Sequence, residues 1–182
     1  MLLDEKRTKR IVRIVAILTS IAFAGVGAIV IALVIFGGTP TASEQAVKDA
    51  RARVETAPND PDALSNLAGA LRADGKVDEA VTTAQKAVQI APRRYDPTRA
   101  LVAILIQEGR RGEAITALQE FTARNPKEPD AFLQLGQLAQ QAGRTPLARL
   151  SYQAYLRLNP QGATPDSVRQ ALDDLNSPNG GQ

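Results

Sequence analysis

The sequence predicts an all-α protein in which an N-terminal transmembrane helix precedes an α-solenoid of three helical hairpins. Three observations predict this fold class. Residues 14–36 form a run of 23 residues without a charge. Between Pro61 and Pro160 the sequence repeats with a period of 34 residues. Each repeat carries a glycine at its fifteenth position and a proline near its end, where helices commonly stop.

The N-terminal residues predict a basic cytoplasmic tail (1–13) followed by a membrane span (14–36). The tail holds five of the chain's 22 lysines and arginines and two of its 19 acidic residues. A helix of 23 residues is about 35 Å long, which suffices for a hydrocarbon core of about 30 Å. Because basic flanks stay in the cytoplasm, we expect a single-pass anchor in the cell (inner) membrane, with the repeats periplasmic or extracellular. A cleaved signal peptide is the alternative, although its apolar region would be shorter.

Small side chains recur every four residues within this span, at Ser20, Ala24, Ala28 and Ala32. Such a stripe allows a second transmembrane helix to approach closely, so we expect helix packing along it. The alternative is that this face contacts only lipid.

After a linker (37–41), residues 42–58 predict a single helix with Ala46, Ala50 and Val54 on one side. Ala46, Ala50 and Pro58 lie 34 residues before Ala80, Ala84 and Pro92. We therefore expect the second half of a repeat, covering the exposed end of the first complete repeat.

Residues 61–160 predict three hairpins, with units at 61–94, 95–128 and 129–160. Apolar residues at positions four, seven, eight and eleven form one face of each first helix. A glycine then ends that helix, a small residue lets the second helix lie close, and a proline ends the unit: Gly75, Gly109, Gly143; Ala80, Ala114, Ala148; Pro92, Pro126, Pro160. Asp60-Pro61 and Asp96-Pro97 predict an N-cap followed by the first helical residue.

After the repeats, residues 161–175 predict a capping helix. Its apolar residues are Val168, Ala171, Leu172 and Leu175, at helical spacing, and its other face is polar. We expect residues 176–182 to be disordered.

On these residues the three units resemble tetratricopeptide repeats (TPRs). The small and aliphatic parts of the family pattern are present, whereas Leu64 and Thr98 replace the usual aromatic residue at position four. Bulky Phe121 and Tyr155 occupy position twenty-seven. The first departure predicts looser helix packing, and the second predicts that larger side chains of the neighbouring helix compensate.

The resemblance implies a concave groove lined by the first helices. Carried over position by position, its lining residues are Ser65, Gly69, Arg72, Arg99, Ala103, Ile106, Gln107, Leu133, Gln137, Gln140 and Gln141. Two arginines can hold a ligand carboxylate, and amides can pair with the backbone of an extended peptide. The alternative is that these residues are only solvated helix faces.

Composition excludes several kinds of site. The chain has no cysteine and no histidine, which removes disulfides, thiol nucleophiles and the usual zinc ligands. We expect no catalytic residue, cofactor or metal, and therefore no enzyme. Beyond the tail, 17 basic and 17 acidic residues remain, which argues against nucleic-acid binding.

The resemblance thus implies a membrane-anchored scaffold for protein–protein interaction, with a protein or peptide partner in the groove. One anchor followed by exoplasmic repeats resembles bacterial proteins that assist c-type cytochrome maturation or accompany the secretion channel. The alternative is a structural subunit, held in a membrane complex through its transmembrane helix and another such helix.

Overall fold

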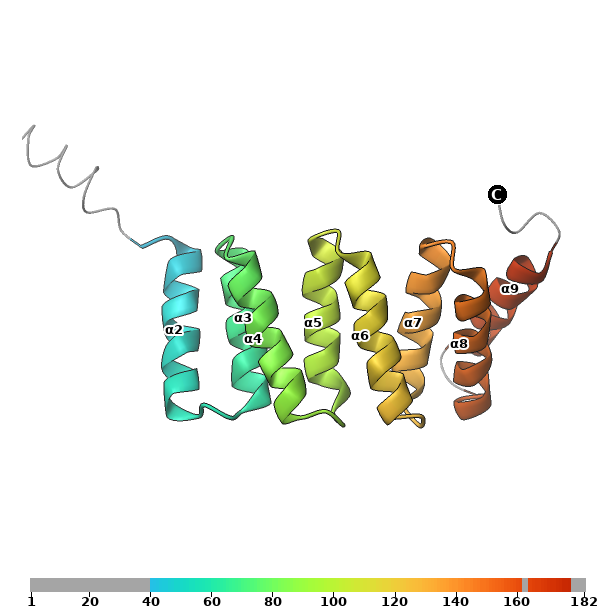
Figure 1. Cartoon of the computed structure of the whole chain (residues 1–182), viewed down its shortest axis with the longest axis horizontal. Helices are drawn as coiled ribbons and strands as arrows, with labels where there is room; N and C mark the ends of the chain where they lie inside the picture. Colours follow the sequence, from blue (N-terminus) through green and yellow to red (C-terminus); the bar gives the residue numbers. More distant parts are fainter. Residues whose placement is uncertain (1–39, 162–163, 178–182) are drawn as a thin grey trace, which may run out of the picture. The chain divides into compact units, whose positions relative to one another are not determined.

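The computed structural model describes residues 40–161 and 164–177, and within them all regular structure is α-helical. The helices follow one another side by side in sequence order (Figure 1). Their bounds are α2 (Ala42–Thr56), α3 (Pro61–Ala73), α4 (Val77–Ile90), α5 (Tyr95–Gln107), α6 (Arg111–Arg124), α7 (Pro129–Gln141), α8 (Thr145–Leu158) and α9 (Pro165–Asn176).

The helices pack as three consecutive hairpins, α3–α4, α5–α6 and α7–α8. Neighbouring hairpins meet through α4 on α5 and α6 on α7, while α2 packs on α3 and α9 packs on α8. No hairpin can bury its apolar side alone, and this nearest-neighbour stacking solves that problem. The predicted α-solenoid of three hairpins is therefore confirmed.

The three predicted glycines form the turns inside the hairpins. Gly75, Gly109 and Gly143 have φ values of 76°, 72° and 68°, a region that other residues enter only at a cost. In the first turn, the Gly75 amide donates to Arg72 O and the Lys76 amide donates to Leu71 O, both at 2.9 Å. The same pair of bonds recurs one and two repeats later, so all three helices end in Schellman motifs.

Small residues allow the close helix contacts that the sequence predicts. Ala80, Ala114 and Ala148 are each fully buried. Gly136 on α7 plays the same part, because a Cβ added there would lie 2.6 Å from the ring of Tyr152 on α8. Any larger residue at Gly136 would force this ring to move.

One of the two predicted helix starts is confirmed and the other is wrong. Asp60 is the N-cap of α3, and its carboxylate accepts the Asp62 amide at 2.9 Å. In contrast, α5 begins at Tyr95, so Asp96 and Pro97 lie inside its first turn. Pro97 is tolerated there because the first amides of a helix need no intrahelical partner.

The predicted half-repeat helix also needs a correction. In α2, Val47 and Ala50 are buried against the first hairpin, whereas Ala46 is exposed. Ala80, the equivalent of Ala46, packs against the first helix of its own hairpin. No such helix precedes α2 among the described residues, so Ala46 has nothing to contact on that side.

The core divides into two clusters of buried side chains. The first extends from Val47 in α2 to Leu138 in α7. The second joins the end of α7 to α8 and α9, through Ala139, Ala148, Tyr152, Tyr155, Val168 and Leu175. The predicted capping helix is thus present, with Val168 and Leu175 buried.

The tail predicted at 176–182 does not include Asn176, which is still helical in α9. Residues 178–182 lie outside the described residues. So do the predicted span at 14–36 and its stripe of Ser20, Ala24, Ala28 and Ala32. In the part of the chain that the structure describes, no helix is long and apolar enough to cross a membrane.

Candidate functional site

The eleven groove residues predicted from the repeat pattern all lie on the first helices, α3, α5 and α7. Seven of them are exposed and four are half-buried: Gly69, Arg99, Ala103, Gln107, Gln137, Gln140 and Gln141 are exposed, and Ser65, Arg72, Ile106 and Leu133 are half-buried. A Cβ added at Gly69 would meet no atom within 4 Å, so the space expected there is open.

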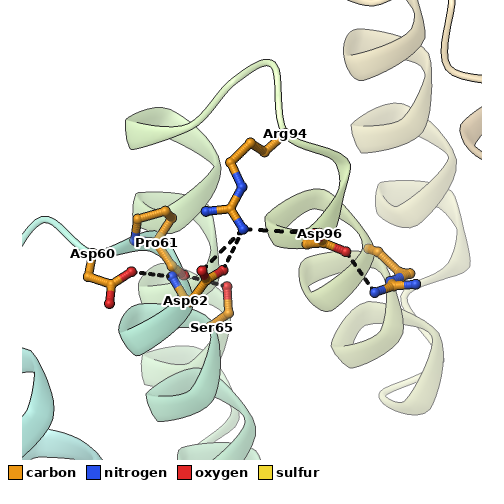
Figure 2. A network of polar contacts seen from close by, with 7 residues as sticks. Asp60, Pro61, Asp62, Ser65, Arg94 and Asp96 are labelled. Carbon is orange, nitrogen blue, oxygen red and sulfur yellow. Dashed lines mark hydrogen bonds and ion pairs between the residues drawn. The ribbon is translucent and has the colours of Figure 1, made fainter.

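A chain of ion pairs links the first two repeats at the N-terminal ends of α3 and α5 (Figure 2). The Arg94 guanidinium donates to both carboxylate oxygens of Asp62, at 2.9 and 3.1 Å, and lies 3.8 Å from the Asp96 carboxylate. Arg99 donates to Asp96 at 2.7 Å. All four side chains are about half exposed or more, so each pair contributes little to stability.

Some of the predicted groove groups already have partners within the protein. The Ser65 hydroxyl donates to the Pro61 carbonyl at 2.7 Å, and the Tyr152 hydroxyl donates to the Gln140 side chain at 2.7 Å. Arg72 and Arg99 occupy positions twelve and five of their repeats, about 10 Å apart along the helix direction. A site in which both arginines hold one carboxylate therefore stays a prediction.

The second helices form a different surface, with a cleft between α4 and α6 above α5. We call it the Thr98 cleft. Its volume is about 630 Å³. Its floor includes Thr98, Leu101, Leu105 and Phe121, and its walls are Gln85, Val88, Gln89 and Pro92 on one side and Glu113, Thr116, Ala117, Glu120 and Arg124 on the other.

A smaller cleft occupies the equivalent place one repeat later, between α6 and α8 above α7. We call it the Phe132 cleft, and its volume is about 280 Å³. Every residue that lines it lies 34 positions after a residue that lines the Thr98 cleft: Gln119, Thr122, Ala123, Phe132, Leu135, Leu147, Leu150 and Ser151. The backbone thus builds the same cleft twice, and larger apolar side chains fill the second.

The Thr98 cleft carries an unpaired polar group. Thr98 is 1% exposed, and its hydroxyl oxygen has no hydrogen-bond partner among the described residues. A buried hydroxyl without a partner is costly, so its position calls for an explanation. Phe121, which also lines the cleft, has its ring centroid 5.3 Å from that of Tyr95, and Tyr95 donates its hydroxyl hydrogen to Gln134.

The charges near this cleft are locally compensated. Arg110 donates to both carboxylate oxygens of Glu113, at 2.7 and 2.6 Å, which lowers the pKa of Glu113. Arg124 lies 3.5 Å from Glu120. Burial, together with the Asp130 carboxylate, raises the pKa of Tyr95, which stays neutral at physiological pH. The cleft is therefore polar at its rim and apolar at its floor.

Sequence reasoning placed no binding residue on the second helices. The signal that could have found this cleft was present, because Thr98 replaces the aromatic residue of the repeat pattern at position four. Looser packing was expected there, and the cavity lies at that position. Within the described ranges, no group of three or more acidic residues is placed to hold a metal ion.

Comparisons with known proteins agree with this architecture. Residues 28–128 match the family described as bacterial transcriptional activator domain, and residues 100–163 match the tetratricopeptide repeat family. The comparison with curated proteins gave no match.

Several solved structures share the fold. MamA (residues 41 to the end) from Desulfovibrio magneticus RS-1 is 21% identical, with 75% of each chain covered and a TM-score of 0.55. A tetratricopeptide repeat protein from Parabacteroides merdae is 17% identical, over 71% of this chain and 52% of that one, with a TM-score of 0.58. The pilF protein of Pseudomonas aeruginosa is 25% identical, over 73% and 60%, with a TM-score of 0.55.

Proposed function

Because the chain belongs to the bacterial transcriptional activator domain family and its hairpins are tetratricopeptide repeats, we propose that it is a non-enzymatic scaffold for protein–protein interaction. Residues 14–36 hold it in the cell (inner) membrane, with the N-terminus cytoplasmic and the repeats periplasmic or extracellular. There it supports the assembly or maturation of other proteins. Nucleic acid is not its partner, since basic and acidic residues balance in number after residue 13.

One observation carries this proposal: position nine is exposed in all three first helices, at Gly69, Ala103 and Gln137. We call these three positions the strip, and in the first two repeats the strip carries no bulky side chain. The first helices α3 and α5 also pack directly on each other. An extended partner segment can therefore lie across them, and the amides of Gln107 and Gln137 can bind its backbone.

The ion pairs at one end of this strip suit exchange with a partner. Arg99 and Asp96 are 63% and 59% exposed, so their pairing in water is weak. A carboxylate of the partner can replace Asp96 as the acceptor of Arg99 at little cost, because the hydrogen bonds of Arg99 are kept. Arg72, half-buried near the other end of α3, provides a second cationic contact.

Photo-crosslinking in the full-length, membrane-embedded protein tests the groove. A crosslinking residue at Ala103 or Gln137 should give a discrete protein adduct, whereas one at Gln153, exposed on the second helix α8 and outside both clefts, should not. Gly69→Leu fills the strip and should reduce the adduct from Ala103 at least tenfold, while Arg157→Ala on α8 should leave it unchanged. Equal adducts from Ala103 and Gln153, unaffected by Gly69→Leu, would contradict the groove.

The anchor and its orientation need a separate measurement. Protease added to intact spheroplasts should digest the protein after Gly38 and leave the short tail protected. Digestion of the repeats only after lysis would contradict this orientation. The alternative is a structural subunit that is held in a complex through its membrane helix. Partner capture with two separate fragments distinguishes the two functions. A scaffold retains its partner through residues 40–182, and a structural subunit retains it through residues 1–41.

A further inference from the structure

We propose that copies of this protein associate head to tail, with α9 of one copy and α2 of the next forming one composite hairpin. Each end of the solenoid holds half of a repeat. No helix precedes α2 and none follows α9 within residues 40–161 and 164–177. A second copy therefore offers, at each end, the kind of helix that is missing there.

The sequence of α9 follows the pattern of a first helix. Pro165 takes the first position, as Pro61 and Pro129 do in their repeats. Positions four, seven, eight and eleven are then apolar: Val168, Ala171, Leu172 and Leu175. Val168 and Leu175 are buried in the cluster that joins α9 to α8. The helix α9 thus packs on α8 as α5 packs on α4 and α7 packs on α6.

Two positions show what each end lacks. Position eight is buried in all three complete repeats, where the second helix of the hairpin covers it, whereas Leu172 of α9 is only half-buried. Position twenty is likewise buried at Ala80, Ala114 and Ala148, whereas Ala46 of α2 is exposed. The surface left open at each end therefore lies where the other helix of a hairpin would pack.

The side chains at these positions are complementary in size. In the third repeat the small residue at position eight, Gly136, lies against the large residue at position twenty-four, Tyr152. The composite hairpin has the reverse arrangement, with Leu172 at position eight and with Ala46 and Ala50 at positions twenty and twenty-four. One large side chain against two small ones lets the helices approach closely and fills the space between them.

Charge favours the same pairing. Position twenty-seven holds an apolar or aromatic side chain in the complete repeats, but α2 has Arg53 there. Because the helices of a hairpin are antiparallel, this position lies near the start of the first helix. At the start of α9, the Asp166 carboxylate is 96% exposed and pairs with Arg169 of its own helix. Arg53 can share this carboxylate, so that its charge stays matched inside the composite hairpin.

The α2 surface takes a second copy rather than the N-terminal segment of its own chain. The 34-residue period places the missing first helix at residues 27–39, and the proposed membrane span at 14–36 includes most of this stretch. This step rests on the proposed function, because a segment inside the bilayer cannot pack on α2. Three hairpins separate α2 from α9 within one copy (Figure 1). Since the contact uses a different surface on each copy, association can continue into longer chains.

Disulfide formation in membranes tests the composite hairpin, because the chain has no cysteine of its own. The full-length double variant Ala46→Cys/Leu172→Cys should form a reducible ladder of dimers and larger species. When the two substitutions are placed on separately tagged, co-expressed copies, the product should be a dimer that carries both tags. Ala46→Cys/Asp173→Cys is the matched control and should give at least tenfold less product, because Asp173 lies at position nine, which is exposed in every complete repeat.

Three results would overturn the proposal. Equal products from the two pairs, or dimers from Ala46→Cys alone, would mean that the copies meet in another way. In Ala46→Cys/Val34→Cys, the second cysteine stands at position eight of the 27–39 stretch. A disulfide within one chain of this variant would show that the chain's own residues cover α2, and it would contradict the anchor as well.

A second measurement decides the outcome if Leu172→Cys does not fold. A photo-crosslinking residue at Ala46, in the otherwise unchanged full-length chain, should form an adduct with residues 165–176 of a second copy. An adduct with another protein, or none, would contradict the composite hairpin. Gly69→Leu should leave the disulfide ladder unchanged, so failure here is distinguishable from failure of the groove.

Discussion

The Thr98 and Phe132 clefts use the same arrangement of three helices, yet only one is spacious. Three of the positions that differ carry a larger apolar side chain in the second cleft: Phe132, Leu147 and Leu150 stand where the Thr98 cleft has Thr98, Glu113 and Thr116. The hairpins below them differ as well. In the third repeat Gly136 accommodates Tyr152, whereas the second repeat has Val102 and Leu118 at the same positions. A constant backbone thus supports two surfaces, one open and one filled.

The largest effect is expected when the packed pair Gly136 and Tyr152 is replaced by the pair found in the second repeat. Gly136→Val should destabilise the protein by about 3 kcal/mol, at the upper end of overpacking costs, because its Cβ would lie 2.6 Å from the Tyr152 ring. Adding Tyr152→Leu recreates the pair found in the second repeat and should restore most of the loss. Urea unfolding of the single and double variants measures this coupling, and additive losses would contradict the exchange.

A smaller loss should follow when the Phe132 cleft is opened. Phe132 is half-buried, so Phe132→Thr should cost about 2 kcal/mol, less than the 3–5 kcal/mol of a fully buried ring. Urea unfolding of the variant and the wild type measures this loss. An unchanged unfolding midpoint would show that the Phe132 ring contributes no packing between α6 and α8.

Two of the three tyrosines of these repeats, Tyr95 and Tyr152, should make stability fall at alkaline pH. Burial raises the pKa of both Tyr95 and Tyr152, while the unfolded tyrosines ionise near the ordinary value of about 10. Their contribution is fully present below that pH and is lost above it, by at most about 1.4 kcal/mol per pH unit for each tyrosine. Urea midpoints between pH 8 and pH 11.5 measure the slope. The slope should be shallower in Tyr95→Phe, and an unchanged slope would mean that other groups cause it.

The smallest effect is expected at the rim of the filled cleft. Leu150 is 65% exposed, so Leu150→Thr, which copies Thr116, should change the free energy of unfolding by less than about 0.5 kcal/mol. Thermal unfolding of the variant measures this. A larger loss would indicate that Leu150 helps to hold α6 and α8 together.

The solenoid was predictable because its signals are local and repeated three times. Position fifteen needs a positive φ, which glycine adopts at low cost. Alanine at position twenty permits close contact between the two helices of a hairpin, whatever the surroundings. The start of α5 was misjudged because Asp96-Pro97 has the local features of a helix start, while the repeat period places that start at Tyr95. Ala46 was misjudged because its burial depends on a neighbouring helix that its own sequence does not reveal.

The candidate site was only partly predictable. Sequence positions place the groove residues on the first helices, but they do not show that Arg99 pairs with Asp96, since that depends on side-chain geometry. The Thr98 cleft is formed by three helices from two repeats, so no single stretch of sequence contains it. Thr98 in place of an aromatic residue was its one visible sign.

The division of the core into two clusters has a consequence for hydrogen exchange. The second cluster joins α8 and α9 to the end of α7. Ala131, Leu135 and Leu138 of α7 belong to the first cluster, so they can stay packed when the second cluster opens. Cooperative opening units commonly coincide with such clusters. Amides of α8 and α9 should therefore exchange together, at a lower opening free energy than those of α3 to α6. The C-terminal end can thus loosen and close again while the two repeats that carry Gly69 and Thr98 stay folded.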